Sequence, residues 1–185
     1  GAIIVGNCMG NSVYQQGNTV VLNEFEFTPE EQEFLMYQVE VSPFQNKASN
    51  HIVKRPGSVN FSVVGRDATV EQRQLYKQFD KQYQERVRIA KEFMQKFPRF
   101  EVYIGGDISV DICLSGANKS QFATLFEAFP NNKIYFFGDK MDEWGIDRPL
   151  GDRILGDARG RVFHITNGYS QTKNILIHLL ENDIL

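Results

Sequence analysis

The chain has 185 residues and a formal net charge of −3, and 42% of its residues are hydrophobic. This composition is typical of a folded protein with one core or two small lobes, and it excludes a disordered chain. The acidic balance argues against a general nucleic-acid surface, and the longest purely apolar runs of four residues are too short to span a membrane.

The first part of the chain predicts a strand, a hairpin and a helix. Residues 2–5 form a continuous apolar run that favours a buried strand. Residues 13–22 place short apolar stretches on either side of a Gln-Gly-Asn turn, as in a hairpin. Thr28 is a suitable N-cap for a helix because a proline and two glutamates follow it. Residues 42–50 have the composition of a loop.

Two further strands and a long helix follow. Residues 51–54 and 58–64 are expected to be strands, the second because apolar and polar residues alternate along it. Gly65 permits a tight turn after that strand. Apolar residues then recur at spacings of three and four over residues 70–97, which predicts one amphipathic helix that Pro98 ends. Its apolar stripe belongs either to the core or to an interface between two copies.

Three arginines surround the second of these strands. Arg55 precedes it, Arg66 lies in the turn after it, and Arg73 lies one turn into the helix. Forked guanidinium donors near a helix N-terminus suit a phosphate group. The alternative is that all three are solvated surface residues with acidic neighbours.

Residues 100–104 and 107–114 are expected to be the next two strands. The second alternates, with Ser109 and Asp111 on one side and isoleucine and valine on the other. One face of this strand is therefore polar, where a sheet packed into a core is usually apolar.

The pattern changes after residue 115. Helix 119–129, strand 133–137, loop 138–152, strand 161–165 and helix 170–181 alternate along the chain. This alternation is typical of a parallel α/β sheet. We therefore expect an α/β lobe built from residues 1–17 and 115–185, and an α+β lobe from residues 18–114.

Acidic residues follow strand 133–137. Gly138 and Asp139 come directly after it, and Asp147 lies eight residues beyond Asp139. Ligands of α/β proteins bind at the carboxyl ends of parallel strands, and carboxylate oxygens suit Mg²⁺. The alternative for Asp139 is a polar loop without a metal, and for Asp147 a residue that caps or turns the loop.

Three segments carry a resemblance to a known family: VKRPGSVNFSVVGRDATVEQR (53–73), GGDISVDICLSGANKSQ (105–121) and IYFFGDKMDEWGID (134–147). With this spacing they resemble the eukaryotic-type phosphomannomutases of the haloacid dehalogenase (HAD) superfamily, which carry an inserted C2-type cap. The resemblance runs from about Gly10 to the C-terminus. It implies an α/β HAD-like, Rossmann-like core, present in part, with an inserted α+β cap domain of antiparallel sheet and helices.

The resemblance also implies roles for individual residues. It assigns the binding of a hexose phosphate or bisphosphate to Arg55, Arg66, Arg73, Ser109 and Asp111. The family's cap mediates a homodimer, so we expect one here.

The core motifs of the family fall on three residues. Lys119 matches the third motif of the superfamily, a catalytic cation beside the transferring phosphoryl group. Asp139 matches the fourth motif, which supports Mg²⁺, and Asp147 is a second candidate metal ligand.

The sequence departs from the family in one respect, because it contains no Asp-x-Asp pair. In the family the first aspartate of that pair accepts the phosphoryl group and the second is the general acid and base. We therefore expect this chain alone to be inactive and to bind Mg²⁺ weakly or not at all. It is either part of a phosphomannomutase, an isomerase that interconverts mannose 6-phosphate and mannose 1-phosphate, or a non-catalytic hexose-phosphate-binding module, as a pseudoenzyme or partner subunit.

The two cysteines bear on the location of the protein. Cys8 and Cys113 lie far apart in apolar surroundings, with no Cys/His cluster of the kind that binds zinc. We expect them to be reduced thiols of a cytoplasmic protein, and no signal peptide is expected.

Overall fold

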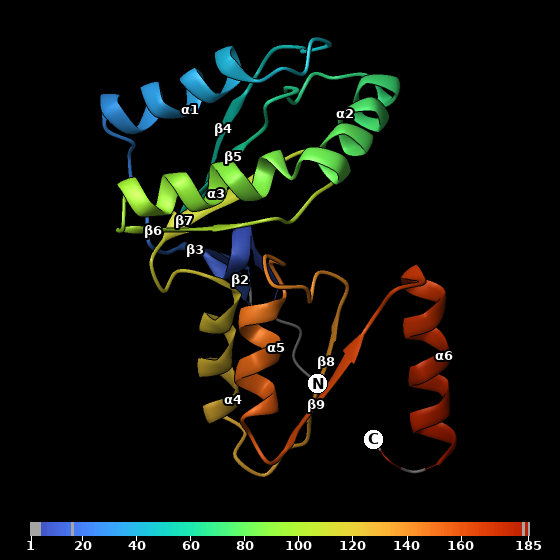
Figure 1. Ribbon diagram of the computed structural model, residues 1–185. Helices are drawn as coiled ribbons and strands as arrows, with labels where there is room; N and C mark the ends of the chain where they lie inside the picture. Colours follow the sequence, from blue (N-terminus) through green and yellow to red (C-terminus); the bar gives the residue numbers. More distant parts are fainter. Residues whose placement is uncertain (1–4, 16, 183, 185) are drawn as a thin grey trace. The chain divides into compact units, whose positions relative to one another are not determined.

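A computed structural model describes residues 5–15, 17–182 and 184 (Figure 1). The chain divides into two compact units, Gly1–Asn118 and Lys119–Leu185, and each is described by itself. The strand predicted at residues 2–5 lies outside the described residues except for its last residue. The assignment of residues 1–17 to an α/β core stays a prediction.

The first unit begins with a small antiparallel sheet. Its strands β1 (Val5–Asn7), β2 (Ser12–Gln15) and β3 (Asn18–Val21) pair in sequence order. Strands β2 and β3 confirm the predicted hairpin, with Ser12 opposite Val21.

A larger sheet in the first unit has the strand order β4-β5-β7-β6, and all neighbours are antiparallel. The strands are β4 (Ile52–Arg55), β5 (Ser58–Phe61), β6 (Phe100–Tyr103) and β7 (Val110–Leu114). This arrangement confirms the antiparallel sheet that was predicted for the α+β lobe.

One face of the larger sheet belongs to the hydrophobic core. Successive side chains of a strand point to opposite faces, so every second residue contributes to it. The buried apolar residues of this face are Val59, Phe61, Phe100, Val102, Val110 and Ile112. Helix α3 (Glu85–Lys96) packs on β6, where the ring centroids of Phe93 and Phe100 are 5.5 Å apart.

Two capping boxes begin helices of the first unit. Helix α1 (Pro29–Val41) follows the N-cap Thr28, as predicted. Helix α2 (Val70–Tyr83) follows the N-cap Thr69, whose side chain accepts a hydrogen bond from the backbone N–H of Gln72. Each box satisfies backbone N–H groups that would otherwise lack partners at the helix start.

The prediction of one helix over residues 70–97 is wrong, because the chain breaks between α2 and α3. Gln84 is left-handed, with φ 52° and ψ 37°. The carboxylate of Asp80 accepts hydrogen bonds from the backbone N–H and the Nε of Arg86, both at 2.8 Å. Asp80 thus caps the first turn of α3 and redirects the chain, a tertiary arrangement that hydrophobic periodicity does not reveal.

The second unit contains a parallel strand pair, β8 (Ile134–Gly138) and β9 (Gly160–His164), with Ile134 opposite Gly160. The helix α5 (Arg148–Leu155) connects them. The prediction of a loop over 138–152 is therefore wrong from Arg148 onward.

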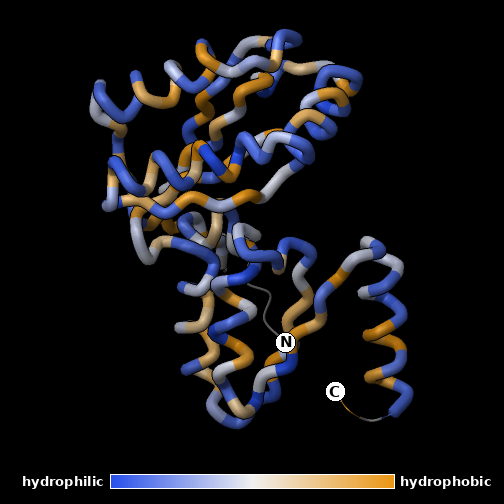
Figure 2. The backbone as a smooth tube through the Cα atoms, in the orientation of Figure 1, coloured by the Kyte–Doolittle hydropathy of each residue, from blue (hydrophilic) through white to orange (hydrophobic). Residues whose placement is uncertain are grey.

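Of the two helices predicted around this strand pair, one is observed as predicted and the other is not. The predicted helix 119–129 is a 3-10 helix (Lys119–Ala123) followed by a short α4 (Thr124–Glu127). Helix α6 (Gly168–Glu181) is present as expected, and hydrophobic residues (orange) concentrate in its C-terminal half (Figure 2). The core of the unit consists of Ile134, Leu150 and Ile154, with Phe122, Phe126, Phe136 and Val162 packed against them.

Within the described part of the chain, no helix has the length and apolar character needed to cross a bilayer.

Candidate functional site

The second face of the larger sheet is polar and buried. Strand β5 places Asn60 on this face between two serines, and the pairing of β5 with β7 sets Asn60 opposite Asp111. Ser109 lies on the same side just before β7. The exposed fractions of Asn60, Ser109 and Asp111 are 2%, 1% and 7%. Buried polar side chains require hydrogen-bond partners, so their contacts decide what this face can do.

Asn60 connects the two predicted sugar-binding residues. Its Nδ2 donates to Ser109 Oγ at 3.0 Å and to Asp111 Oδ1 at 2.9 Å. The Nη1 of Arg55 lies 3.5 Å from the same Asp111 Oδ1. The structure therefore brings Arg55, Ser109 and Asp111 together. Asn60 was not among the residues predicted for the site, although Ser58, Asn60 and Ser62 alternate with apolar residues and so indicate a polar strand face.

Arg66 lies in the turn after β5 and is half-buried. Burial lowers the pKa of its guanidinium, the charges of Arg55 and Arg73 lower it further, and Asp111 opposes the shift. Arg55 and Arg73 thus both lie within electrostatic reach of Arg66. Among the ion pairs between described residues, none includes Arg66. Its charge is therefore available to an anion.

Arg73 holds the turn that carries Arg66. Its Nε donates to the carbonyl oxygen of Ala68 at 2.9 Å, and its Nη2 donates to that of Arg66. Gly65 also shapes this turn, with a φ of 88° and with the carbonyl oxygen of Ser49 only 2.3 Å from the place where a Cβ would lie. At least part of the guanidinium of Arg73 therefore serves the loop and not a ligand.

In the second unit the loop after β8 is organised by Asp147. Its Oδ1 pairs with the ammonium group of Lys119. Its Oδ2 accepts hydrogen bonds from the backbone N–H groups of Asp139 at 2.9 Å and Lys140 at 3.0 Å. Burial alone would raise the pKa of Asp147, but these hydrogen bonds and the charge of Lys119 outweigh burial and lower it. Asp147 is therefore an anion that holds both Lys119 and the loop.

The residues predicted to bind Mg²⁺ do not complete a site for it. The carboxylate of Asp147 already accepts from three donors, whereas Asp139 is exposed. The described residues contain no group of three or more metal-ligating side chains. Since Mg²⁺ requires six oxygen ligands, one available carboxylate would leave most of the shell to water and phosphate oxygens.

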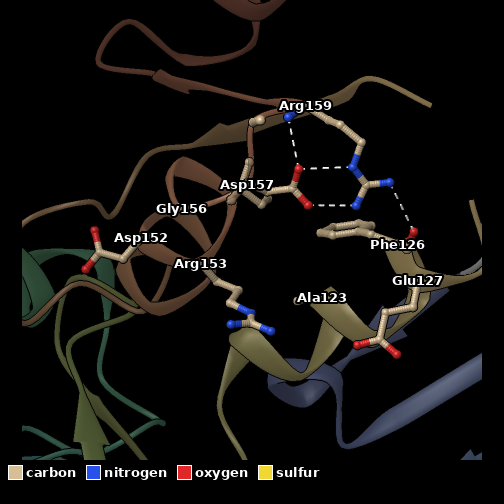
Figure 3. A pocket seen from close by; sticks show the side chains of 10 residues that line it. Ala123, Phe126, Glu127, Asp152, Arg153, Gly156, Asp157 and Arg159 are labelled. Carbon is tan, nitrogen blue, oxygen red and sulfur yellow. Dashed lines mark hydrogen bonds and ion pairs between the residues drawn. The ribbon is translucent and has the colours of Figure 1, made fainter. Parts of the chain in front are cut away.

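A separate cavity of about 430 Å³ lies in the second unit, between α4 and the chain that leads into β9 (Figure 3). Its lining includes Asp157 and Arg159, which form a two-pronged ion pair with distances of 3.0 and 2.7 Å. This pairing lowers the pKa of Asp157 to about 2. None of the residues predicted for binding or catalysis lines the cavity.

Comparison with solved structures shows the class of fold. The N-terminally truncated, IMP-bound IMP-nucleotidase of Plasmodium falciparum matches with a TM-score of 0.56 over 96% of this chain and 48% of that chain. Its sequence identity is 14%, so the likeness concerns the fold alone. The fold is that of the HAD-like proteins, with part of an α/β core and an α+β cap.

Sequence comparison identifies the family within that class. A family model described as eukaryotic phosphomannomutase matches residues 9–181. The probable phosphomannomutase of Caenorhabditis elegans is 31% identical over 137 residues, which are 73% of this chain and 52% of that protein. The phosphomannomutase of Saccharomyces cerevisiae is 34% identical over 108 residues, 56% of this chain and 42% of that protein. The chain belongs to the eukaryotic phosphomannomutase family, and it spans about half the length of the curated relatives it matches.

Proposed function

We propose that this chain binds a hexose phosphate or hexose bisphosphate on the polar face of its larger sheet, as part of a phosphomannomutase. The observation that carries the proposal is the buried group of Asn60, Ser109 and Asp111 together with the half-buried guanidinium of Arg66, which none of the ion pairs between described residues includes. Family membership supports it, because relatives that the chain matches are named phosphomannomutases.

The charges divide the proposed site into two parts. Arg55, Arg66 and Arg73 supply the positive charge that a phosphate requires, and forked donors match its oxygens. Ser109 and Asp111 supply groups that hydrogen-bond sugar hydroxyls. A phosphate is nearly symmetric, so the arginines can hold either end of a bisphosphate, as a mutase requires.

We propose roles in phosphoryl transfer for two residues of the second unit. Transfer requires positioning and charge neutralisation more than covalent chemistry from the surroundings. Lys119, held in one place by Asp147, would place a cation beside the transferring group. Asp139 would hold Mg²⁺ weakly, and the ion would supply further neutralisation of phosphate charge when bound.

The 185-residue chain by itself is proposed to lack turnover, because it contains no Asp-x-Asp pair. Without a phosphoryl acceptor and a general acid and base, positioning alone contributes little rate. The second candidate function, a non-catalytic hexose-phosphate-binding module, is favoured by this same absence beside an assembled polar face.

We also propose a homodimer formed through the cap. Helices α1 and α2 expose large apolar side chains, among them Tyr37 at 57%, Val70 at 76% and Tyr83 at 59%. Large apolar side chains that the single chain leaves exposed are available to such an interface.

A cytoplasmic location is proposed from the thiols. Cys8 and Cys113 are both free. Burial, with the charges of Glu101 and Asp111, raises the pKa of the Cys113 thiol to about 12, as expected of an unreactive core cysteine.

Calorimetric titration and a turnover assay test the main proposal together. Mannose 1-phosphate and glucose 1,6-bisphosphate are titrated into the purified chain, and conversion of mannose 1-phosphate is then followed. Saturable binding without turnover is expected. The absence of binding at millimolar ligand would overturn the binding role, and robust turnover would overturn the proposed inactivity.

A further inference from the structure

The side chain of Asn60 lies between the residues proposed to bind the sugar. We propose that Asn60 is a positioning residue that fixes the hydrogen-bonding polarity of Ser109 and Asp111, so that this part of the site selects a sugar hydroxyl over a phosphate oxygen. The inference rests on the proposed function and adds a basis for its ligand selectivity.

The position of Asn60 is set by the sheet itself. It lies within β5, which pairs with both β4 and β7, and its backbone register places it opposite Asp111. With 2% exposure, its side chain has little freedom to turn away from Ser109 and Asp111.

The orientation of the Asn60 amide follows from its neighbours. If the amide were reversed, its oxygen would lie 2.9 Å from a carboxylate oxygen of Asp111, and two acceptors would face each other. The NH₂ group must therefore point toward Asp111, where it also reaches Ser109 Oγ.

This orientation leaves the carbonyl oxygen of Asn60 buried without a partner. Within residues 5–15, 17–182 and 184, it is the one buried side-chain oxygen or nitrogen in this condition. Leaving a buried acceptor unpaired destabilises a fold. Folding stability therefore does not explain the arrangement, whereas the two hydrogen bonds that the amide donates to the site do.

The two donated hydrogen bonds decide what Ser109 and Asp111 can offer a ligand. Ser109 Oγ accepts from Asn60, so its own O–H is free to donate. Asp111 accepts from Asn60 through Oδ1, so as a carboxylate it offers a further acceptor in Oδ2. A sugar hydroxyl can accept from Ser109 and donate to Asp111 at the same time. A phosphate dianion only accepts, and the carboxylate repels it.

Ligand selectivity is the measurement that tests this inference. Calorimetric affinities for mannose 1-phosphate and for inorganic phosphate are compared in the wild type, in Asn60→Ala and in Asn132→Ala, a control at an exposed asparagine of the other unit. Asn60→Ala is expected to weaken mannose 1-phosphate binding by about tenfold and phosphate binding by less than about twofold, because the lost contacts orient hydroxyl-binding groups. The control is expected to change neither affinity.

A second measurement covers the case in which Asn60→Ala fails to fold. Monodeoxy derivatives of mannose 1-phosphate are titrated into the wild type and into Asn60→Ser, which keeps a small polar side chain. One derivative is expected to lose about tenfold in affinity for the wild type, and that difference is expected to shrink in Asn60→Ser.

The failures of the two proposals are distinguishable. A wild type that binds neither mannose 1-phosphate nor phosphate overturns the proposed function. A wild type that binds mannose 1-phosphate, with an Asn60 variant that weakens both ligands equally or changes neither, overturns the role of Asn60 alone. Equal affinity of the wild type for every deoxy derivative also contradicts it.

Discussion

The guanidinium of Arg66 is central to the proposed phosphate site. It is half-buried, and burial together with the charges of two other arginines lowers its pKa. Among the described residues it has no ion-pair partner. A phosphate at this position would relieve the repulsion among the three charges. Arg66→Ala is therefore expected to weaken binding of mannose 1-phosphate.

The magnitude follows from the kind of contact that is lost. A charge-assisted hydrogen bond contributes about 1.5–3 kcal/mol, and about 1.4 kcal/mol corresponds to tenfold in affinity, so a loss of about 10- to 100-fold is expected. Arg66→Lys keeps the charge without the fork and should recover part of the affinity. Folding stability should change by less than about 0.5 kcal/mol, because no described carboxylate loses its partner.

Calorimetric titration of the wild type and both variants checks this prediction. Arg88→Ala is the matched control, because it removes an arginine from the same unit whose charge is already paired with Glu92 at 2.9 Å. Equal affinities of the wild type, Arg66→Ala and Arg66→Lys would refute the reasoning, as would an equal loss in the control.

Three further predictions concern the turn, the second unit and the cap. Gly65→Ala should lower the free energy of unfolding in urea by more than Gly116→Ala. Both glycines have a positive φ, which costs a non-glycine residue about 1–3 kcal/mol, but only at Gly65 would the Cβ meet backbone atoms. Asp147→Asn should destabilise the protein near neutral pH by about 1–3 kcal/mol, since Lys119 loses its partner. Because the pKa of Asp147 is lowered on folding, its contribution is present above the ordinary value near 3.8 and is lost as the pH falls below it, so the variant should lose less stability in acid than the wild type. Sedimentation should show a dimer that Tyr83→Glu weakens; a wild-type monomer at tens of micromolar would contradict the cap interface.

The sequence predicted the start of a helix where contacts between neighbouring residues determine that start. Helices α1 and α2 begin at Thr28 and Thr69 because each side chain bonds a backbone N–H three residues on. The break at Gln84 was not predictable in this way, because it depends on Asp80 and on Arg86, whose Nη1 also reaches the distant carbonyl oxygen of Gly106 at 2.6 Å.

Helix α5 was missed because its sequence weakens the helical signal. Gly151 lies in its middle, where a Cβ would lie 2.2 Å from the Cε of Met141. Tertiary packing of Leu150 and Ile154 on the parallel strand pair stabilises this helix despite the poor helix propensity of glycine.

The residues of the candidate site that belong to the family's sequence motifs could be predicted. The resemblance assigned Arg55, Ser109 and Asp111, and the structure brings these three together. Asn60 required the register of β5 against β7, which pairs residues 51 positions apart. The hydrogen bonds from Arg73 to the carbonyl oxygens of Arg66 and Ala68 could not be predicted either, because they depend on the path of the backbone after Gly65.

The central claim is that this chain binds a hexose phosphate on the polar face of its larger sheet. An NMR titration of the ¹⁵N-labelled chain with mannose 1-phosphate tests it most directly, because it detects binding and locates it at once. Saturable shifts are expected, largest for the amides of β5, β7 and residues 65–68. No saturable shift at millimolar ligand, or shifts largest around the cavity beside Asp157 and Arg159, would contradict the claim.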